Sequence, residues 1–296
     1  MNPITTGAPG VAGAAGAAGA VGSATRRLAA RLAVRLAARV LPPLIAVLLV
    51  LSLWEVVFLA GWRPPYVLPA PAEVLQRFAA ALVEAKFWVS LTTTLIRAFV
   101  GFGLAVLIGT GIGLLVSGSR VLRSAIGSLI TGMQTMPSIA WFPFAILLFG
   151  LSEQAIEFVV VLGAAPSIAN GLISGIDEVP PPLLRTAKAL GAKGLVLYRH
   201  IVLPAALPAY LSGLKQGWAF AWRSLMAGEL LVIIASRPSL GAQLQFFREF
   251  ADTAGLMSTM LVILLLGMAV DGGFSYLSRR IQARRGLGTD RASARG

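Results

Sequence analysis

The stretch LLRTAKALGAKGLVLYRHIVLPAALP, residues 183–208, lies between two long apolar runs and decides how the rest of the chain is interpreted. It carries four basic residues: Arg185, Lys188, Lys193 and Arg199. Leu184, Ala187 and Gly191 nevertheless recur at spacings of three and four, which puts them on one helical face. Gly191 suits a helix end, because glycine adopts the left-handed cap conformation at little cost. The stretch predicts a helix-turn-helix whose apolar face is typical of a docking surface for another protein.

The composition excludes most soluble classes. Of 296 residues, 57% are hydrophobic and 12% are charged, whereas soluble domains carry about 25% charged residues. We therefore expect an all-α integral membrane protein with a single membrane domain. The chain has no Cys and one His, so a disulfide, a thiolate site or a His-rich metal site is not expected. We interpret His200 as a surface residue.

The charge and motif content narrow the function further. The formal net charge is +13, which in so apolar a chain indicates contact with anionic membrane lipid rather than nucleic acid. No Gly-x-x-x-x-Gly-Lys-Ser/Thr pattern occurs, so ATP binding by a phosphate loop is not expected. No Ser-His-Asp or metal-ligand set stands out. We therefore predict no enzyme activity and no cofactor bound by this chain.

The order of the residues predicts four regions. Residues 1–24 are rich in Gly and Ala and are expected to form a disordered tail. Residues 25–40 carry an arginine every fourth position and predict a basic amphipathic helix at the membrane interface; the alternative is the start of a secretory signal, although no clear cleavage site follows. Residues 41–280 are the predicted transmembrane domain, and residues 281–296 are a basic cytoplasmic tail.

About six apolar runs are long enough to cross a hydrocarbon core of ~30 Å. They are residues 41–61, 91–116, 122–150, 155–176, 209–235 and 256–277. Between them, Val74, Phe78 and Leu82 recur every four residues after Pro71 and predict an amphipathic helix too polar to span; another is expected around residues 244–247. Lys and Arg concentrate in both tails, near Arg120 and in residues 183–208, so all of these are predicted to be cytoplasmic.

Polar residues beside prolines in the apolar runs are candidates for a solute path. Gln134, Thr135 and Ser138 surround Pro137 in the third run, and Asn170 follows a proline in the fourth. A proline bends a helix and frees a carbonyl group, which in lipid must find a partner or face a cavity. Kinks whose backbone groups are satisfied by neighbouring helices are an equally good interpretation.

Charged residues within the runs are the second set of candidates. Arg223 and Glu229 lie six apart in the fifth run and cannot share a helical face, so each needs another partner, for which Asp271 is one candidate. They are either part of the solute path or members of structural ion pairs. Arg97 either extends its charge to the interface, the preferred interpretation, or contributes to a gate.

Small residues at a spacing of four predict where helices approach closely. The pairs are Gly109 with Gly113, Gly171 with Gly175, and Gly213 with Gly217. Each places two residues without side chains on one helical face, which lets a neighbouring helix pack near the backbone.

Several motifs resemble one transporter family. One motif consists of Gly191, nine further residues, Ile201, one residue, and then Leu203 and Pro204. This motif resembles the cytoplasmic signature loop of permease subunits of binding-protein-dependent ABC importers. That signature begins with Glu-Ala-Ala, where this chain has Arg185, Thr186 and Ala187, so only the last position matches. The segments LPAP at residues 68–71, TLIR at 94–97 and GLKQGWAFAWRSLMAGELL at 213–231 are similar to the sulfonate, nitrate and taurine group of these permeases.

The resemblance implies a permease in the cell membrane with a cytoplasmic coupling helix between its fourth and fifth spans. It implies a second copy of the chain, cytoplasmic ATPase subunits that use ATP and magnesium, and an extracytoplasmic solute-binding protein. The residues it assigns to the ATPase-docking loop are Arg185, Ala187, Lys188, Gly191, Ala192, Leu195, Tyr198, Ile201, Leu203 and Pro204.

The solute implied by this group is a small anion such as an aliphatic sulfonate, nitrate or taurine. A permease for a thiamine-precursor-like solute is one alternative. An ion-coupled secondary transporter that uses Arg223, Glu229 or Asp271 is another, and a membrane-embedded enzyme is a third with little support.

Overall fold

The computed structural model of the protein describes residues 41–284, without the side chains at positions 120, 124 and 282–284. The tail expected at residues 1–24, the interfacial helix expected at 25–40 and most of the basic tail at 281–296 lie outside this part. The described chain divides into two compact units, with the boundary after Pro71. Every regular element in the described part is helical, so the prediction of an all-α membrane protein is confirmed.

The first unit contains one apolar helix, Leu41–Leu59, which corresponds to the first predicted span. The helix is followed by an irregular segment that folds back on it. The indole Nε1 of Trp54 donates a 3.2 Å hydrogen bond to the carbonyl oxygen of Pro69.

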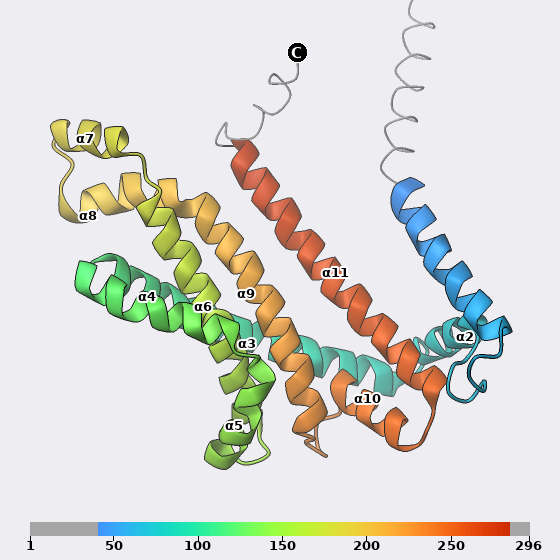
Figure 1. Cartoon of the computed structure of the whole chain (residues 1–296). Coiled ribbons are helices and arrows are strands. Elements are labelled where there is room, and N and C mark those ends of the chain that lie inside the picture. The colour runs from blue at the N-terminus through green and yellow to red at the C-terminus, as the bar shows by residue number, and fades with distance from the viewer. Residues whose placement is uncertain (1–40, 285–296) are drawn as a thin grey trace, which may run out of the picture. The chain divides into compact units, whose positions relative to one another are not determined.

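The rest of the chain forms a bundle of long helices joined by shorter ones (Figure 1). In order these are α2 (Pro71–Ala81), α3 (Ala85–Ser117), α4 (Arg120–Thr135), a 3-10 turn (Ser138–Trp141), α5 (Phe142–Phe149), α6 (Glu153–Asp177), α7 (Pro181–Ala189), α8 (Gly194–Leu197), a π turn (Tyr198–Val202), α9 (Leu203–Leu231), α10 (Leu240–Glu249) and α11 (Thr253–Arg284). In this second unit α7 and α8 lie at one end, and α5 and α10 lie at the opposite end.

The third predicted run is bent at the expected place. Val121–Thr135 and Ser138–Phe149 meet at an angle of 101°. Pro137 lies between them, and the residue before it, Met136, is extended with ψ 128°, as the proline ring requires of its predecessor. Five helices of the described part are long and apolar enough to cross a membrane, or six if this bent pair forms one span, which agrees with the predicted number.

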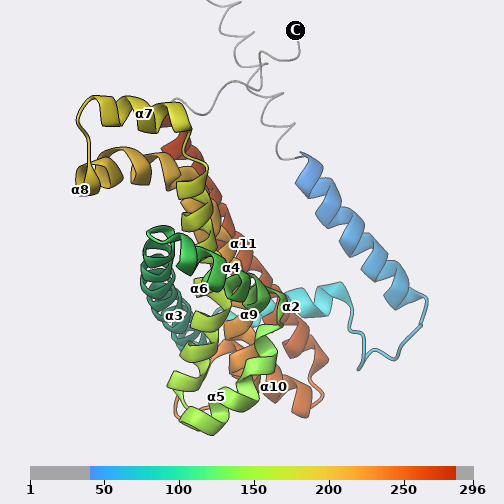
Figure 2. The same ribbon diagram turned by 60° about the vertical axis from the view of Figure 1, so that its left-hand side comes forward.

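Helix α6 is the core of the second unit and packs along both α3 and α9 (Figure 2). The buried cluster around it includes Ala98 of α3, Ile156 and Ile168 of α6, and Leu225 of α9. The outward faces of these helices carry exposed Leu, Val, Ile and Phe side chains. A bundle with apolar surfaces both inside and outside is what a lipid environment favours.

The close approach of α6 and α9 depends on two glycines. A Cβ atom on Gly171 would lie 2.6 Å from the Cα of Gly213, and one on Gly213 would lie 2.8 Å from the Cα of Gly171. Gly109 of α3 faces α6 in the same way, with a Cβ position 2.6 Å from the carbonyl oxygen of Ala165. The predicted helix approaches at small residues are therefore confirmed.

The start of the fifth span differs from the prediction. The apolar run was expected to begin at residue 209, but the helix is continuous over Gly194–Leu231. The Tyr198–Val202 turn is a π turn directly before Pro204, so the helix widens where proline cannot donate an α-helical hydrogen bond. The second arm of the 183–208 segment is consequently fused to α9. The short helix expected around residues 244–247 is present and longer, as α10.

Candidate functional site

A cavity of about 350 Å³ lies at the bend between α4 and α5, against α6 and α9. It brings together four of the six residues proposed for the solute path: Gln134, Thr135, Ser138 and Arg223. Its remaining wall is mostly apolar and includes Trp141, Leu162, Gly163, Phe220 and Ala227. The bend at Pro137 therefore opens a space within the bundle.

The uncharged polar side chains of this cavity differ in their partners. Gln134 Nε2 donates to Ser167 Oγ at 3.2 Å, and Thr135 Oγ1 donates to the carbonyl oxygen of Gly132 at 2.8 Å. The Ser138 hydroxyl makes no hydrogen bond with any residue of the described part. Ser138 is therefore available to a molecule in the cavity, whereas Thr135 is occupied by its own helix.

Arg223 is the one charged side chain among the described residues that line the cavity. It lies on α9, roughly 12 Å from the helix end at Leu231 by the rise of 1.5 Å per residue. Its guanidinium carbon is 5.5 Å from the ring centroid of Phe220. It forms no ion pair within residues 41–284, and it is exposed on the surface of the isolated chain.

The two other path candidates lie outside this cavity. Asn170 is exposed further along α6. Glu229 is completely buried and belongs to a polar network between the last turn of α9 and the start of α10. The suggestion that Asp271 is the ion-pair partner of Arg223 is wrong. Asp271 instead pairs with Lys215 of α9 at 3.3 Å, and Lys215 also donates to Ser275 at 2.9 Å.

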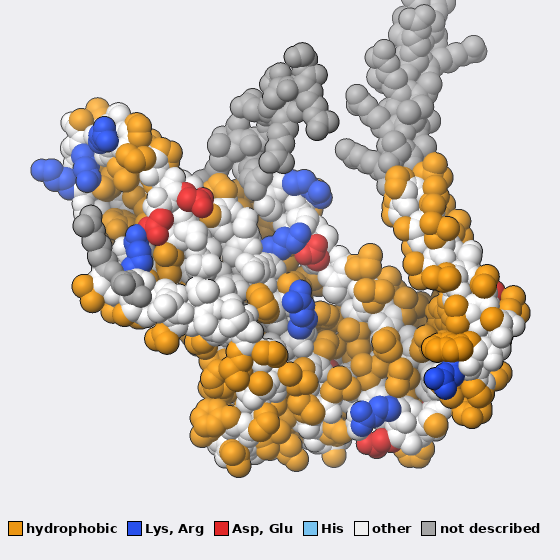
Figure 3. All heavy atoms as spheres, in the orientation of Figure 1, with side chains coloured by type: hydrophobic (Ala, Val, Ile, Leu, Met, Phe, Trp, Pro, Cys, Tyr) orange, Lys and Arg blue, Asp and Glu red, His pale blue; other side chains and the backbone are white. Residues whose placement is uncertain are grey.

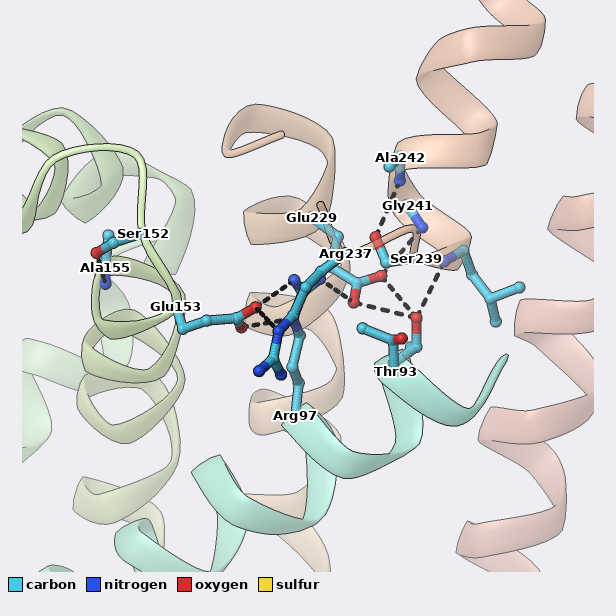
Figure 4. A network of polar contacts seen from close by, with 12 residues as sticks. Thr93, Arg97, Ser152, Glu153, Ala155, Glu229, Arg237, Ser239, Gly241 and Ala242 are labelled. Atoms are coloured by element: carbon cyan, nitrogen blue, oxygen red, sulfur yellow. Dashed lines mark hydrogen bonds and ion pairs between the residues drawn. The ribbon is translucent and has the colours of Figure 1, made fainter. Parts of the chain in front are cut away.

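The network around Glu229 is centred on Arg97 of α3 (Figure 4). Arg97 Nη1 lies 2.9 Å from Glu229 Oε1, and its Nε and Nη2 each donate to Glu153 of α6 at 2.7 Å. Arg97 is 5% exposed, so the preferred interpretation, in which it extends its charge to the interface, is wrong. Burial of Arg97 is tolerated here because N–H groups on two edges of its guanidinium group each meet a carboxylate.

Neutral donors complete the coordination of Glu229. The Thr94 hydroxyl lies 2.9 Å from Oε2, and the backbone amide of Gly241 donates to Oε2 at 3.0 Å. Thr94 Oγ1 also accepts the amide hydrogen of Leu240 at 3.0 Å. A Cβ on Gly241 would lie 2.3 Å from Glu229 Cβ, so only glycine allows this contact. Glu229 thus caps the start of α10 and ties α9 to α3.

The sequence did not point to Glu153 or Thr94 as members of this network. The available signal was the presence of unpaired ionisable residues in apolar runs. It identified Arg97 and Glu229 but not the pairing between them, since they are far apart in the chain.

The predicted docking loop is a compact pair of short helices. Gly191 has a φ of +88°, and α7 ends in two hydrogen bonds, from the Ala192 amide to the Ala187 carbonyl and from the Gly191 amide to the Lys188 carbonyl, both 3.0 Å. This is the Schellman geometry, which favours glycine at that position. The predicted helix end at Gly191 is confirmed.

The loop has its own small core. Ala187 is buried with Val179, Leu197 and Val202, and Ala192 and Ile201 pack against them. Ala187 therefore lies inside the loop of the single chain, and its contact with the ATPase stays a prediction. Its two most exposed apolar side chains are Leu190, 84% exposed, and Leu195, 79% exposed.

The remaining residues assigned to the loop differ in their exposure. Arg185, Lys188 and Tyr198 are exposed, whereas Leu203 and Pro204 are half-buried in the first turn of α9. Lys and Arg side chains gather over α7 and α8 on the face seen in Figure 3. Within residues 41–284 no group of three or more His, Cys, Asp or Glu side chains could hold a metal ion.

Comparison with known proteins identifies the class. Residues 101–283 match the family described as the binding-protein-dependent transport system inner membrane component, and the chain belongs to this family. It is 28% identical over 236 residues to the taurine transport system permease protein TauC of Escherichia coli, covering 78% of this chain and 85% of that protein. It is 24% identical over 251 residues to the nitrate import permease protein NrtB of Synechocystis sp., covering 80% and 88%.

The fold agrees with a solved transporter. A chain of the inward-facing MetNI methionine ABC transporter superposes with a TM-score of 0.57 at 20% identity, covering 66% of this chain and 96% of that one. The protein is thus a multi-pass inner-membrane permease subunit of an ABC importer, and it is not itself the catalytic component. A binding-protein-dependent system implies an ATPase and a solute-binding protein as partners.

Proposed function

We propose that two copies of this chain form the path for a small oxyanion, such as a sulfonate, taurine or nitrate. The printed names of two relatives, a taurine permease and a nitrate permease, support this solute class. The single observation that carries the proposal is Arg223, the one charged side chain among the described residues lining the cavity at the α4–α5 bend.

The position of Arg223 supports both the solute charge and the second copy. A cation near the middle of a span is expensive in lipid, by about 2.5–3.5 kcal/mol on insertion scales. Arg223 is exposed on one chain and has no carboxylate partner within the described part. It therefore fits best against a water-filled path enclosed by a second copy, where an anionic solute neutralises it.

The alternatives make different use of the same residues. Transport of a thiamine-precursor-like solute does not require an unpaired arginine in the cavity. An ion-coupled secondary transporter needs a carboxylate that can exchange a proton or cation, but Glu229 is committed to Arg97, Thr94 and Gly241. Asp271 is paired with Lys215. ATP-driven anion import is the function this arrangement favours.

The orientation follows from the basic loop. We place α7, α8 and both termini in the cytoplasm, because Lys and Arg concentrate there. The ATPase would seat on the exposed Leu190 and Leu195 side chains, with Arg185, Lys188 and Tyr198 around them. Closure of the ATPase pair would move the loop, and because α8 continues into α9 the movement would reach Arg223 directly.

Transport in proteoliposomes tests the proposal. The chain would be reconstituted with its ATPase and solute-binding protein, and ATP-dependent uptake of labelled taurine, an alkanesulfonate and nitrate would be measured. We expect uptake of at least one oxyanion, retained in part by Arg223→Lys and reduced at least tenfold by Arg223→Gln. Arg279→Gln, which removes an exposed cation outside the cavity, is the matched control. Unchanged uptake by Arg223→Gln would overturn the role of this residue.

Co-purification tests the docking surface. Leu195→Glu places a charge on a side chain that is 79% exposed in the loop, and Val83→Glu does the same at a side chain that is 86% exposed before α3. We expect the ATPase to be lost from the first variant and retained by the second. Retention by both would exclude the α7–α8 loop as the docking surface.

A further inference from the structure

Ser224 is the one buried hydroxyl in the described part of the chain that has no hydrogen-bond partner. It lies on α9 directly after Arg223 and is 0% exposed. Serines within helices commonly donate to the carbonyl oxygen four residues earlier, as Ser212 of the same helix does to Pro208 at 3.2 Å. Ser224 does not. A buried polar group without a partner destabilises the state in which it occurs.

The Ser224 hydroxyl does not line the cavity itself but lies beside Gly163, a residue of its wall. Gly163 of α6 lines the cavity, and a Cβ atom on Gly163 would be 2.5 Å from Ser224 Oγ. Any other residue at position 163 would therefore press on this hydroxyl and cover it. Because glycine has no side chain, no Cβ atom of residue 163 obstructs the Ser224 hydroxyl.

A second free hydroxyl belongs to a residue near the same Cβ position of Gly163. The Cβ of Ser138 is 3.7 Å from the Cβ position on Gly163, and the Ser138 hydroxyl has no partner in the described chain. Two serines thus lie within 4 Å of the Gly163 Cβ position, and Arg223 lines the same cavity. Hydroxyl donors in the same cavity as a permanently charged guanidinium group suit an oxygen-rich anion, because the oxygens of such an anion accept several hydrogen bonds at once.

We propose that Ser138 and Ser224, which both lie beside Gly163, donate hydrogen bonds to the oxygens of the transported oxyanion, while Arg223 supplies the charge. Ser224 reaches the solute when α6 and α9 separate slightly at Gly163 during the transport cycle. The hydroxyl is unpaired in the present state and paired in the loaded state, so the solute stabilises the separated arrangement. This inference rests on the proposed function and assigns the specificity of the same cavity.

Three variants separate a binding role from a packing role. Ser224→Ala removes the hydroxyl without adding volume, Gly163→Ala adds the obstructing Cβ, and the double variant has neither the clash nor the hydroxyl. Ser212→Ala, which removes a hydroxyl that has a partner, is the control on the same helix. The measurements are KM and maximal rate of ATP-driven uptake in proteoliposomes, and the Tm of each purified chain.

We expect Ser224→Ala to raise the KM for the oxyanion roughly tenfold, the size of losing one hydrogen bond to a charged group, while its Tm stays equal or rises. Gly163→Ala should raise the KM and lower the Tm. The double variant should recover the Tm but not the KM. Ser212→Ala should change neither.

Two results would overturn the inference. One is an unchanged KM in Ser224→Ala, and the other is a wild-type KM in the double variant, which would give Gly163 a packing role only. If either occurs while Arg223→Gln reduces uptake at least tenfold, the proposed function stands and this inference fails. If wild-type chain takes up no oxyanion, both fail together.

Discussion

Arg97 of α3 and Glu229 of α9 form a buried ion pair of 2.9 Å, although 132 positions separate them in the chain. Glu153 holds the same guanidinium from α6 with two contacts of 2.7 Å. Buried ion pairs therefore join α3, α6 and α9 at one end of the bundle, and close contacts at glycines join them further along. Because α10 is capped by Glu229, the segment after α9 is anchored through the same pair.

Replacing Arg97 should destabilise the fold strongly. Arg97→Met leaves Glu229 buried without its cation, which typically costs about 3–5 kcal/mol. Lys215→Met breaks a pair whose side chains are 44% and 50% exposed, which is worth only about 0–1 kcal/mol. The Tm of the purified variants in one detergent compares the two. Similar Tm values would show that the Arg97 network does not hold the core helices.

Replacing Gly213 should separate α6 from α9. Gly213→Val adds atoms where the Gly171 Cα lies 2.8 Å from the Cβ position, and overpacking of this kind costs about 1–3 kcal/mol. Gly111→Val is the control, because nothing lies within 4 Å of its Cβ position. Detergent-solubilised Gly213→Val should melt earlier and lose uptake, and the control should not. Equal behaviour would contradict the close approach of the two helices.

Gly191 should be replaceable by Asn but not by Val. Its φ of +88° is left-handed, a region in which a β-branched residue costs about 1–3 kcal/mol and Asn is tolerated better. Gly191→Val should therefore distort the cap of α7 and lower the solute carried per ATP hydrolysed, while Gly191→Asn retains most of it. Normal coupling in Gly191→Val would mean that the loop geometry does not matter for transport.

Single cysteines test the orientation, because the chain contains no Cys. Phe250→Cys at the end of α10 and Leu195→Cys in α8 replace side chains that are 69% and 79% exposed. A membrane-impermeant maleimide should label Phe250→Cys in intact spheroplasts, and Leu195→Cys only after the spheroplasts are permeabilised. The unsubstituted chain serves as the blank. The reverse pattern would invert the proposed topology.

The sequence by itself determined the class of protein and its main elements. Apolar runs of membrane length, the basic segment at residues 183–208 and the Gly191 signature are local patterns, and each follows from the physics of one helix in lipid or one helix end. The bend at Pro137 and the close approach at Gly171 and Gly213 are of the same kind. They were predictable because the residue type alone limits the backbone or the space beside it.

Only the tertiary structure decided which of the polar residues work together. Arg97, Glu153 and Glu229 are ionisable residues in separate runs, and spacing along the chain carries no information on which carboxylate meets the guanidinium. The same holds for Ser224, whose hydroxyl lies 2.5 Å from the Cβ position of Gly163 on another helix. Helix packing fixes these relationships, because the cost of burying a charge or a hydroxyl depends on what the neighbouring helix places opposite it.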